Sequence, residues 1–291
     1  MISLITILAA VVPGLLICYF IFRQDKHERE PIPLLVVSFV LGLIIYFIAR
    51  YFEGLLDDFI SPYVEANNWD RSRHLGVLFF SAFIRTAFVE EVLKFIFLLA
   101  IPFQNKNFNE PMDGIVYTVM IGMGFAVLEN LVYCLPDDYA LALVRDFTAV
   151  PSHAVFAVIL GYYVGLAKFM PDKKRKIKYI LFGLFLAVGV HGLYDIFLFQ
   201  EFEDWLMILA TLVLLGGLFF SRRFIDRHQK DSFLRQRSST TGVALLGSQI
   251  TTGNIATSVS IKEEDNEILA AVFYEMKEQQ EATQKTREEE E

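Results

Sequence analysis

Three ionisable residues lie within five positions of one another in an apolar stretch, where charge is expensive. Residues 75–101 are long enough, at about 1.5 Å per residue, to cross a hydrocarbon core of roughly 30 Å, yet they contain Glu90, Glu91 and Lys94. Each such charge costs about 2.5–3.5 kcal/mol at the centre of a spanning helix. Glu90 and Lys94 stand four residues apart, which predicts an ion pair on one helical face and leaves Glu91 unmatched. An unmatched buried carboxylate requires water, a cation or a proton, so the stretch predicts a functional site. The alternative is a structural salt bridge between helices, with Arg85 as an additional partner.

Polar and ionisable residues that could also take part in chemistry interrupt three other apolar stretches. Glu129 and Asn130 lie together in one of them, and His191 and Asp195 stand at i, i+4 in another. At that spacing a carboxylate can accept a hydrogen bond from one imidazole nitrogen and raise the basicity of the other, which suits a metal ligand or a base. His153 begins a third apolar stretch, and a histidine at that position more often lies at the membrane interface than takes part in catalysis.

The depths of these groups allow them to meet. Measured along the predicted helices at about 1.5 Å per residue, they fall within about two helical turns of one another, in the central to outer part of the membrane. We therefore expect one cluster, and two separate clusters would contradict a shared chemistry.

The elements that must position these residues are membrane-spanning helices. Of 291 residues, 54% are hydrophobic and 14% are aromatic, and the mean hydropathy is +0.44, which indicates a polytopic membrane protein. The apolar stretches predict seven spans, of which the last is the least certain, at residues 1–22, 34–52, 75–101, 112–135, 151–169, 177–199 and 205–220.

The distribution of Lys and Arg predicts the orientation of these spans. The segments between spans carry fifteen Lys/Arg on one side of the membrane and three on the other. Because the richer side faces the cytoplasm, the N-terminus is expected outside and the C-terminus inside. The fold class is therefore an all-α, polytopic helix bundle of about seven transmembrane helices, integral to the plasma or inner membrane.

The C-terminal part of the chain differs in composition. Residues 1–223 form the predicted transmembrane domain, residues 224–261 a Ser/Thr-rich cytoplasmic linker, and residues 262–291 an acidic tail with a short amphipathic helix. The tail holds eleven Asp/Glu against four Lys/Arg, so it accounts for −7 of the net charge of −8. The helix in this tail is expected either to bind a partner, whose identity is unknown, or to be exposed to solvent, and the sequence favours neither. Cys18 and Cys134 have no ligand-like spacing and are expected to be packing residues.

Three short patterns carry a resemblance to a known family. EEVLK begins at Glu90, FAVLE ends at Glu129, and HGLYD runs from His191 to Asp195. In order and placement they resemble the EExxK, FxxxE and HxxxD motifs of the PrsW family of intramembrane proteases, which looks related to the CAAX-prenyl-protease superfamily. The resemblance covers roughly residues 31–223, with no departure in the three motifs.

This resemblance implies an intramembrane endopeptidase that cuts a membrane-anchored protein, such as an anti-sigma factor, near the outer half of the bilayer. It implies a lipid environment and no nucleic-acid partner. It also implies catalytic roles for Glu90, Glu91, Glu129 and His191, supported by Lys94, Asp195, His153 and Asn130.

Peptide hydrolysis needs an activated water, a proton donor for the leaving nitrogen and stabilisation of the oxyanion. We predict Glu90 or Glu91 as the general base, with His191 polarising the carbonyl or binding a metal. His191, His153 and Glu129 would form a two-His-plus-carboxylate set suited to Zn²⁺. The residues leave open whether the mechanism uses a metal or a glutamate-activated water alone.

Two other classes of function would also bury such residues. A proton- or ion-coupled transporter places charges along a path, but neither inverted halves nor matching interrupted helices are evident. A non-catalytic scaffold would use the same residues to join helices.

Overall fold

The structure is a computed structural model that describes residues 3–26, 28–135 and 138–251, with side chains as far as Ser232. Within these ranges all regular structure is helical and no strand occurs. The elements, in chain order, are α1 (Leu4–Gln24), α2 (Ile32–Ala66), α3 (Leu75–Phe79), the π-helix η1 (Phe80–Phe88), α4 (Val89–Ala100), the 3₁₀-helix η2 (Pro102–Gln104), α5 (Pro111–Tyr133), α6 (Tyr139–Phe147), α7 (Ala149–Lys168), α8 (Lys173–Phe199), the 3₁₀-helix η3 (Asp204–Leu206) and α9 (Met207–Thr251).

The predicted membrane bundle is confirmed. In the described part of the chain, six helical segments are long and apolar enough to cross a membrane: Leu4–Gln24, Ile32–Ala66, Pro111–Tyr133, Tyr139–Lys168, Lys173–Phe199 and Asp204–Ser232. They correspond to six of the seven expected spans. The exact number of spans and the orientation of the termini stay predictions.

The remaining expected span, at residues 75–101, is present as a helical run that changes its hydrogen bonding along its length. It begins as α3, widens into the π-helix η1 and continues as α4. π-Helical turns are rare and occur frequently at functional sites. Here the π-helix leads directly into the turn that carries Glu90 and Glu91.

The second span is longer than expected. The hydropathy predicts an end at Phe52, but α2 continues to Ala66. Charged residues such as Glu53 and Asp57 end the apolar run without ending the helix, because both are compatible with helical backbone. The extension matters for the site because it carries Glu53 and Asp57 to its outer edge, as described below.

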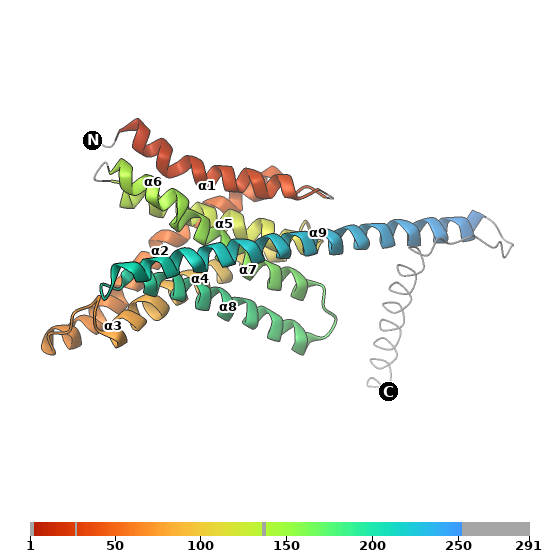
Figure 1. The fold of residues 1–291 in the computed structure, drawn as a ribbon. Coiled ribbons are helices and arrows are strands. Elements are labelled where there is room, and N and C mark those ends of the chain that lie inside the picture. Colours follow the sequence, from red (N-terminus) through yellow and green to blue (C-terminus); the bar gives the residue numbers. More distant parts are fainter. Residues whose placement is uncertain (1–2, 27, 136–137, 252–291) are drawn as a thin grey trace. The chain divides into compact units, whose positions relative to one another are not determined.

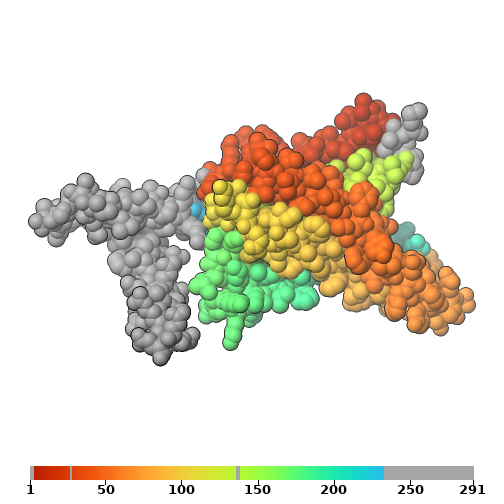
Figure 2. Space-filling model, turned by 180° about the vertical axis from the view of Figure 1, so that it is seen from behind, coloured from red at the N-terminus to blue at the C-terminus, as the bar shows by residue number. Residues whose placement is uncertain are grey.

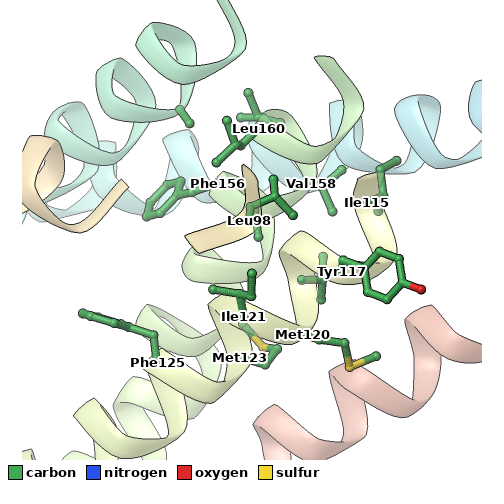
Figure 3. Close-up of a cluster of buried hydrophobic side chains, with 14 of the residues drawn as sticks. Leu98, Ile115, Tyr117, Met120, Ile121, Met123, Phe125, Phe156, Val158 and Leu160 are labelled. Carbon is green, nitrogen blue, oxygen red and sulfur yellow. The ribbon is translucent and has the colours of Figure 1, made fainter. Parts of the chain in front are cut away.

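Helix α5 forms the centre of the bundle (Figure 1), packing against α2 and against α7. Every residue from Pro111 to Val127 is buried, as expected for a helix that is apolar on all sides. Figure 3 shows the core that results, in which Ile121 and Phe125 of α5 lie near Leu98 of α4 and Phe156 of α7. In the reverse view, the residues of α2 form an orange band across the face that is seen (Figure 2).

Small residues set the close approach of these helices. A Cβ atom added at Gly42 of α2 or Gly124 of α5 would strike the backbone of the opposite helix, and the same holds for Gly114 of α5 and Gly161 of α7. Such contacts between glycines let helix backbones touch in a membrane. They fix α5 against both neighbours, and so fix the residues that α5 and α7 carry.

The chain divides into two compact units, Met1–Gln229 and Lys230–Glu291. The first contains α1 to α8 and the part of α9 before Lys230. What is described of the second is the continuation of α9 to Thr251, so the helix extends into the segment that the composition predicts as a linker. The predicted acidic tail and its amphipathic helix, at residues 262–291, lie outside the described residues.

Candidate active site

The side chain of Lys94 lies at the centre of a buried cluster. Its Nζ is 2.8 Å from Oε1 of Glu91, 3.1 Å from Oε2 of Glu90 and 3.3 Å from Nδ1 of His153 on α7. The ammonium also lies over the ring of Phe125, 4.2 Å from its centroid. The predicted Glu90–Lys94 pair is therefore confirmed. The expectation that Glu91 lacks a partner is wrong, because positions i+3 and i+4 share a helical face and one lysine reaches both carboxylates.

His191 of α8 is held from both sides by carboxylates. Its Nδ1 is 3.0 Å from Oε1 of Glu91, and its Nε2 is 3.4 Å from Oδ2 of Asp195, one turn away. The ring of Phe156 stacks on the imidazole at 4.3 Å between centroids. The expected contact between His191 and Asp195 is present as an ion-pair distance, but it is not aligned as a hydrogen bond, and that oxygen of Asp195 makes none.

His153 of α7 links this group to Glu129 of α5. Its Nε2 is 3.0 Å from Oε2 of Glu129, and its Nδ1 is 4.0 Å from Oε2 of Glu90. The rings of His153 and His191 lie 5.5 Å apart. Helices α4, α5, α7 and α8 therefore bring the predicted residues into one cluster, and the histidine that the sequence ranked lowest connects its two halves.

Arg145 of α6 also contacts this cluster, although the sequence analysis did not identify it. Its Nη2 donates to Oε2 of Glu129 at 2.6 Å, its Nε donates to Oδ1 of Asn130 at 3.0 Å, and its guanidinium lies over the ring of Tyr133. Arg145 lies in a segment expected to be a loop between spans. The available signal was Asp138, whose side chain caps a helix that begins at the next residue.

Asn130 points away from the cavity. Its amide nitrogen is 3.0 Å from Oδ1 of Asp146 and 3.3 Å from the carbonyl oxygen of Ala10, while its amide oxygen accepts from Arg145. It therefore reaches the site only through Arg145, which it helps to hold beside Glu129.

A cavity of about 80 Å³ opens beside the cluster. Because a single water requires roughly 10–15 Å³ of such volume, the cavity accommodates several waters or a short piece of polypeptide. Glu90, Glu129, His153 and His191 line it, whereas Glu91 and Lys94 are not among the lining residues. Glu129 is the most accessible of the cluster carboxylates, with 14% of its side chain exposed against 3% for Glu90.

Arginines and acids from α2 and η1 form another part of the cavity wall. Arg50 pairs with Glu53 at 2.5 Å, and both line the cavity together with Arg85. Arg85 lies 3.4 Å from Asp57 of the α2 extension, and no ion pair joins it to Glu90 or Glu91, as the alternative structural interpretation would have required. Among the described residues, Nε of Arg85 is buried without a hydrogen-bond partner.

The formal charges of the cluster do not balance. Its four carboxylates carry −4 and its two permanent cations carry +2, which leaves −2 when both histidines are neutral; the six residues are Glu90, Glu91, Glu129, Asp195, Lys94 and Arg145. Uncompensated charge in a buried site is expensive. One divalent cation or two protons would neutralise it.

One group in the described chain has the donor types and the proximity of a metal site. The ligand atoms of Glu90, His153 and His191 all lie within 4.8 Å of one another, and the three residues are buried. Two histidines and a carboxylate are a ligand set that hydrolytic zinc enzymes use, so the donor set fits a metal. The sequence predicts Glu129 as the third metal ligand beside the two histidines, whereas in the structure Glu90 is the carboxylate that lies with them.

Comparison with known proteins identifies the family of the chain. Residues 30–220 match the family model described as the PrsW family intramembrane metalloprotease. The match covers all the cluster residues and stops before the C-terminal part of the chain. No solved structure matches the chain.

Several curated proteins are also similar. The chain is 30% identical to Protease PrsW of Bacillus subtilis (strain 168), over 70% of this chain and 87% of that protein. It is 32% identical to Protease PrsW of Geobacillus kaustophilus (strain HTA426), over 70% and 83% of the two chains. For Protease PrsW of Halalkalibacterium halodurans the identity is 31%, over 74% and 92%. These relatives favour neither a transporter nor a scaffold.

Proposed function

Since this chain belongs to the PrsW family of intramembrane metalloproteases, we propose that it hydrolyses a peptide bond of a membrane-anchored protein in the cavity between α4, α5, α7 and α8. The chain is a multi-pass membrane protein and a peptide hydrolase.

The observation that carries the proposal is the single buried cluster beside a cavity. Glu90, Glu129, His153 and His191 come from four different helices and all line the same small space. Stable membrane proteins rarely bury so many ionisable groups without a function. Here the groups also include a proton acceptor, a proton donor and positively charged or metal-binding groups that can stabilise the oxyanion of peptide hydrolysis.

Glu90, His153 and His191 would hold the metal, which we propose to be Zn²⁺. When bound, such an ion supplies a Lewis acid and lowers the pKa of a coordinated water to about 7. Glu91 then positions His191, because its Oε1 lies 3.0 Å from one ring nitrogen, and the other ring nitrogen, which makes no aligned hydrogen bond to Asp195, is left to bind the ion. Lys94 compensates the charge of Glu90 and Glu91, and it holds both acids in place.

Glu129 is the proposed general base. Its Oε2 is held by Arg145 and His153, while its Oε1 has no hydrogen-bond partner in the described chain and is free to accept the proton of a water. The same oxygen then donates that proton to the leaving nitrogen, so the proton balance closes. This exchanges the roles expected from sequence, which gave the base to Glu90 or Glu91 and a ligand role to Glu129.

The proposed substrate is a membrane protein with a single anchor, such as an anti-sigma factor, cut near the outer half of the bilayer. Two considerations support this class. The family resemblance implies it, and the Lys/Arg distribution predicts that the cluster lies in the central to outer part of the membrane.

The test compares two substitutions in the detergent-purified full chain, incubated with a candidate single-pass substrate. Glu129→Gln should abolish cleavage but keep the metal content of wild type, as measured by elemental mass spectrometry of the purified protein. Glu90→Gln should lower both. Glu65→Gln, on an exposed part of α2, is the matched control and should change neither. Full cleavage by Glu129→Gln, or an unchanged metal content in Glu90→Gln, would contradict the assigned roles.

A further inference from the structure

A second, larger cavity lies on the far side of α7 from the cluster. It measures about 650 Å³ and is formed by α1, α7 and the first part of α9. On α7 its wall is made by Pro151, Ala154, Val155 and Val158, which repeat at helical spacing. His153 and Phe156 lie on the other face of the same helix and line the catalytic cavity. We call this second cavity the α1–α9 groove.

The groove is amphipathic along its length. Apolar side chains, among them Ile17, Ile21 and Leu218, form most of the wall. Polar side chains gather where α1 ends, at Gln24 and Lys26. The Lys/Arg distribution predicts that this end faces the cytoplasm.

Two of the charged residues that line the groove are cations without an ionic partner. Among the described residues, no carboxylate lies within 4.0 Å of Lys26 or Arg222, although both line the groove. Asp226, one turn beyond Arg222, reduces the net charge of the lining to +1 and offers an acceptor to a headgroup ammonium or hydroxyl. The polar end therefore matches a group that is mainly anionic.

Ser221 gives an independent indication of a ligand. It is 6% exposed and lines the groove next to Arg222, and its Oγ is buried without a hydrogen-bond partner in the described chain. A buried hydroxyl without a partner costs about 1–3 kcal/mol. It lies between the apolar part and the charged end, which is where the ester carbonyls of a glycerolipid would be.

The volume, the charge and the position of the groove together favour a lipid. Its volume falls within the range of about 300–1,000 Å³ that is usual for small-molecule sites. Basic pockets between spanning helices on the cytoplasmic side are known sites for phospholipid headgroups.

We propose that the α1–α9 groove binds one membrane glycerophospholipid. Its phosphate contacts Lys26 and Arg222, its ester carbonyl accepts a hydrogen bond from Ser221, and one acyl chain lies along the apolar wall toward Val155. The lipid thereby supports the face of α7 that is opposite His153. This site is separate from the catalytic cavity and does not depend on the roles proposed there.

The test uses native mass spectrometry of the full chain in a mild detergent, with phosphatidylglycerol or phosphatidylethanolamine added as the probe. Wild type should retain one phospholipid per chain. The double variant Lys26→Gln/Arg222→Gln should bind it roughly thirtyfold more weakly, since each cation near the membrane surface contributes about a fivefold factor. The matched control is Arg23→Gln/Arg223→Gln, which removes two neighbouring cations that stack on Tyr19 and Phe219 instead of lining the groove.

A second pair of variants keeps the proposal falsifiable if removing the charges disturbs folding. Leu218→Trp fills the apolar part of the groove and should also release the lipid, whereas Leu212→Trp, on an exposed part of α9 outside the groove, should not. Retention of the phospholipid by both Lys26→Gln/Arg222→Gln and Leu218→Trp would overturn the proposal. So would an equal loss in the Arg23→Gln/Arg223→Gln control, a wild type that binds no phospholipid, or a polypeptide found bound in its place.

Discussion

Removal of the Lys94 ammonium is the perturbation that most directly tests how the cluster is held together. Lys94→Met keeps an unbranched side chain of nearly the same length beside Phe125, but it removes the ammonium that lies 3.1 Å from Glu90 and 2.8 Å from Glu91. The formal charge of the cluster changes from −2 to −3. Breaking a buried ion pair by deleting one partner destabilises proteins by about 3–5 kcal/mol, because the remaining charge stays buried.

This loss is large relative to a total stability of about 5–15 kcal/mol. At about 2–4 °C per kcal/mol for a chain of this size, the midpoint of thermal unfolding should fall by roughly 6–20 °C. The measurement is a thermal melt of the detergent-purified protein. Lys178→Met, which removes an exposed lysine from α8, is the matched control and should leave the midpoint unchanged.

A double variant separates charge from packing. Glu90→Gln combined with Lys94→Met returns the cluster to −2, so it should be more stable than Lys94→Met alone by a coupling of about 0.5–3 kcal/mol. If Lys94→Met melts within about 2 °C of wild type, the lysine does not compensate buried charge. If the double variant melts no higher than Lys94→Met, the loss comes from packing, and the electrostatic reasoning is refuted.

Three further predictions concern other contacts. Arg145→Gln should slow single-turnover cleavage by roughly 100-fold because it frees the held oxygen of Glu129, and Arg145→Lys should recover only part of the rate because it lacks the fork geometry. Gly192→Ala places a methyl group against an aromatic ring of η1 and should lower stability by about 1–3 kcal/mol in chemical unfolding, whereas Gly189→Ala, with open space at its Cβ, should not. Burial raises the pKa of Asp25 to about 7 in the folded protein, so the stability it contributes is present below its unfolded pKa of about 3.9 and is lost as the pH rises through 7. The difference in melting midpoint between Asp25→Asn and wild type should therefore grow from pH 4 to pH 7 and stay level above; a difference independent of pH would contradict this.

The sequence predicted the parts of this molecule that depend on hydropathy and on fixed helical spacing. The spans follow from apolar length, and the Glu90–Lys94 pair follows from a separation of four residues. The meeting of His191 with Glu91 was only compatible with the predicted depths, because it depends on how α8 packs against α4. No spacing within one helix reports that packing.

The features that the sequence analysis missed have physical reasons. Arg145 belongs to α6, a helix of nine residues that is too short to give a reliable apolar period. The π-helix η1 has the same composition as an ordinary apolar helix, so hydropathy does not distinguish the two. The extension of α2 was missed because Glu53 and Asp57 look like the end of a span, although they continue a helix that leaves the apolar stretch.

The distribution of unpaired atoms explains why so costly a cluster is retained. If stability alone mattered, well-packed apolar side chains could replace a buried ionic network at no loss, or with a gain of about 1–4 kcal/mol. Here Oε2 of Glu91, Oδ2 of Asp195 and Nε of Arg85 are buried without hydrogen-bond partners in the described chain, and all belong to the cluster or to the cavity wall. A network that is only partly satisfied is less stable than either a complete one or an apolar core. Asp195 and Arg85 line the cavity, so their unpaired atoms gain partners when water, a cation or a peptide group enters it, and groups that are unfavourable in isolation then favour a bound substrate.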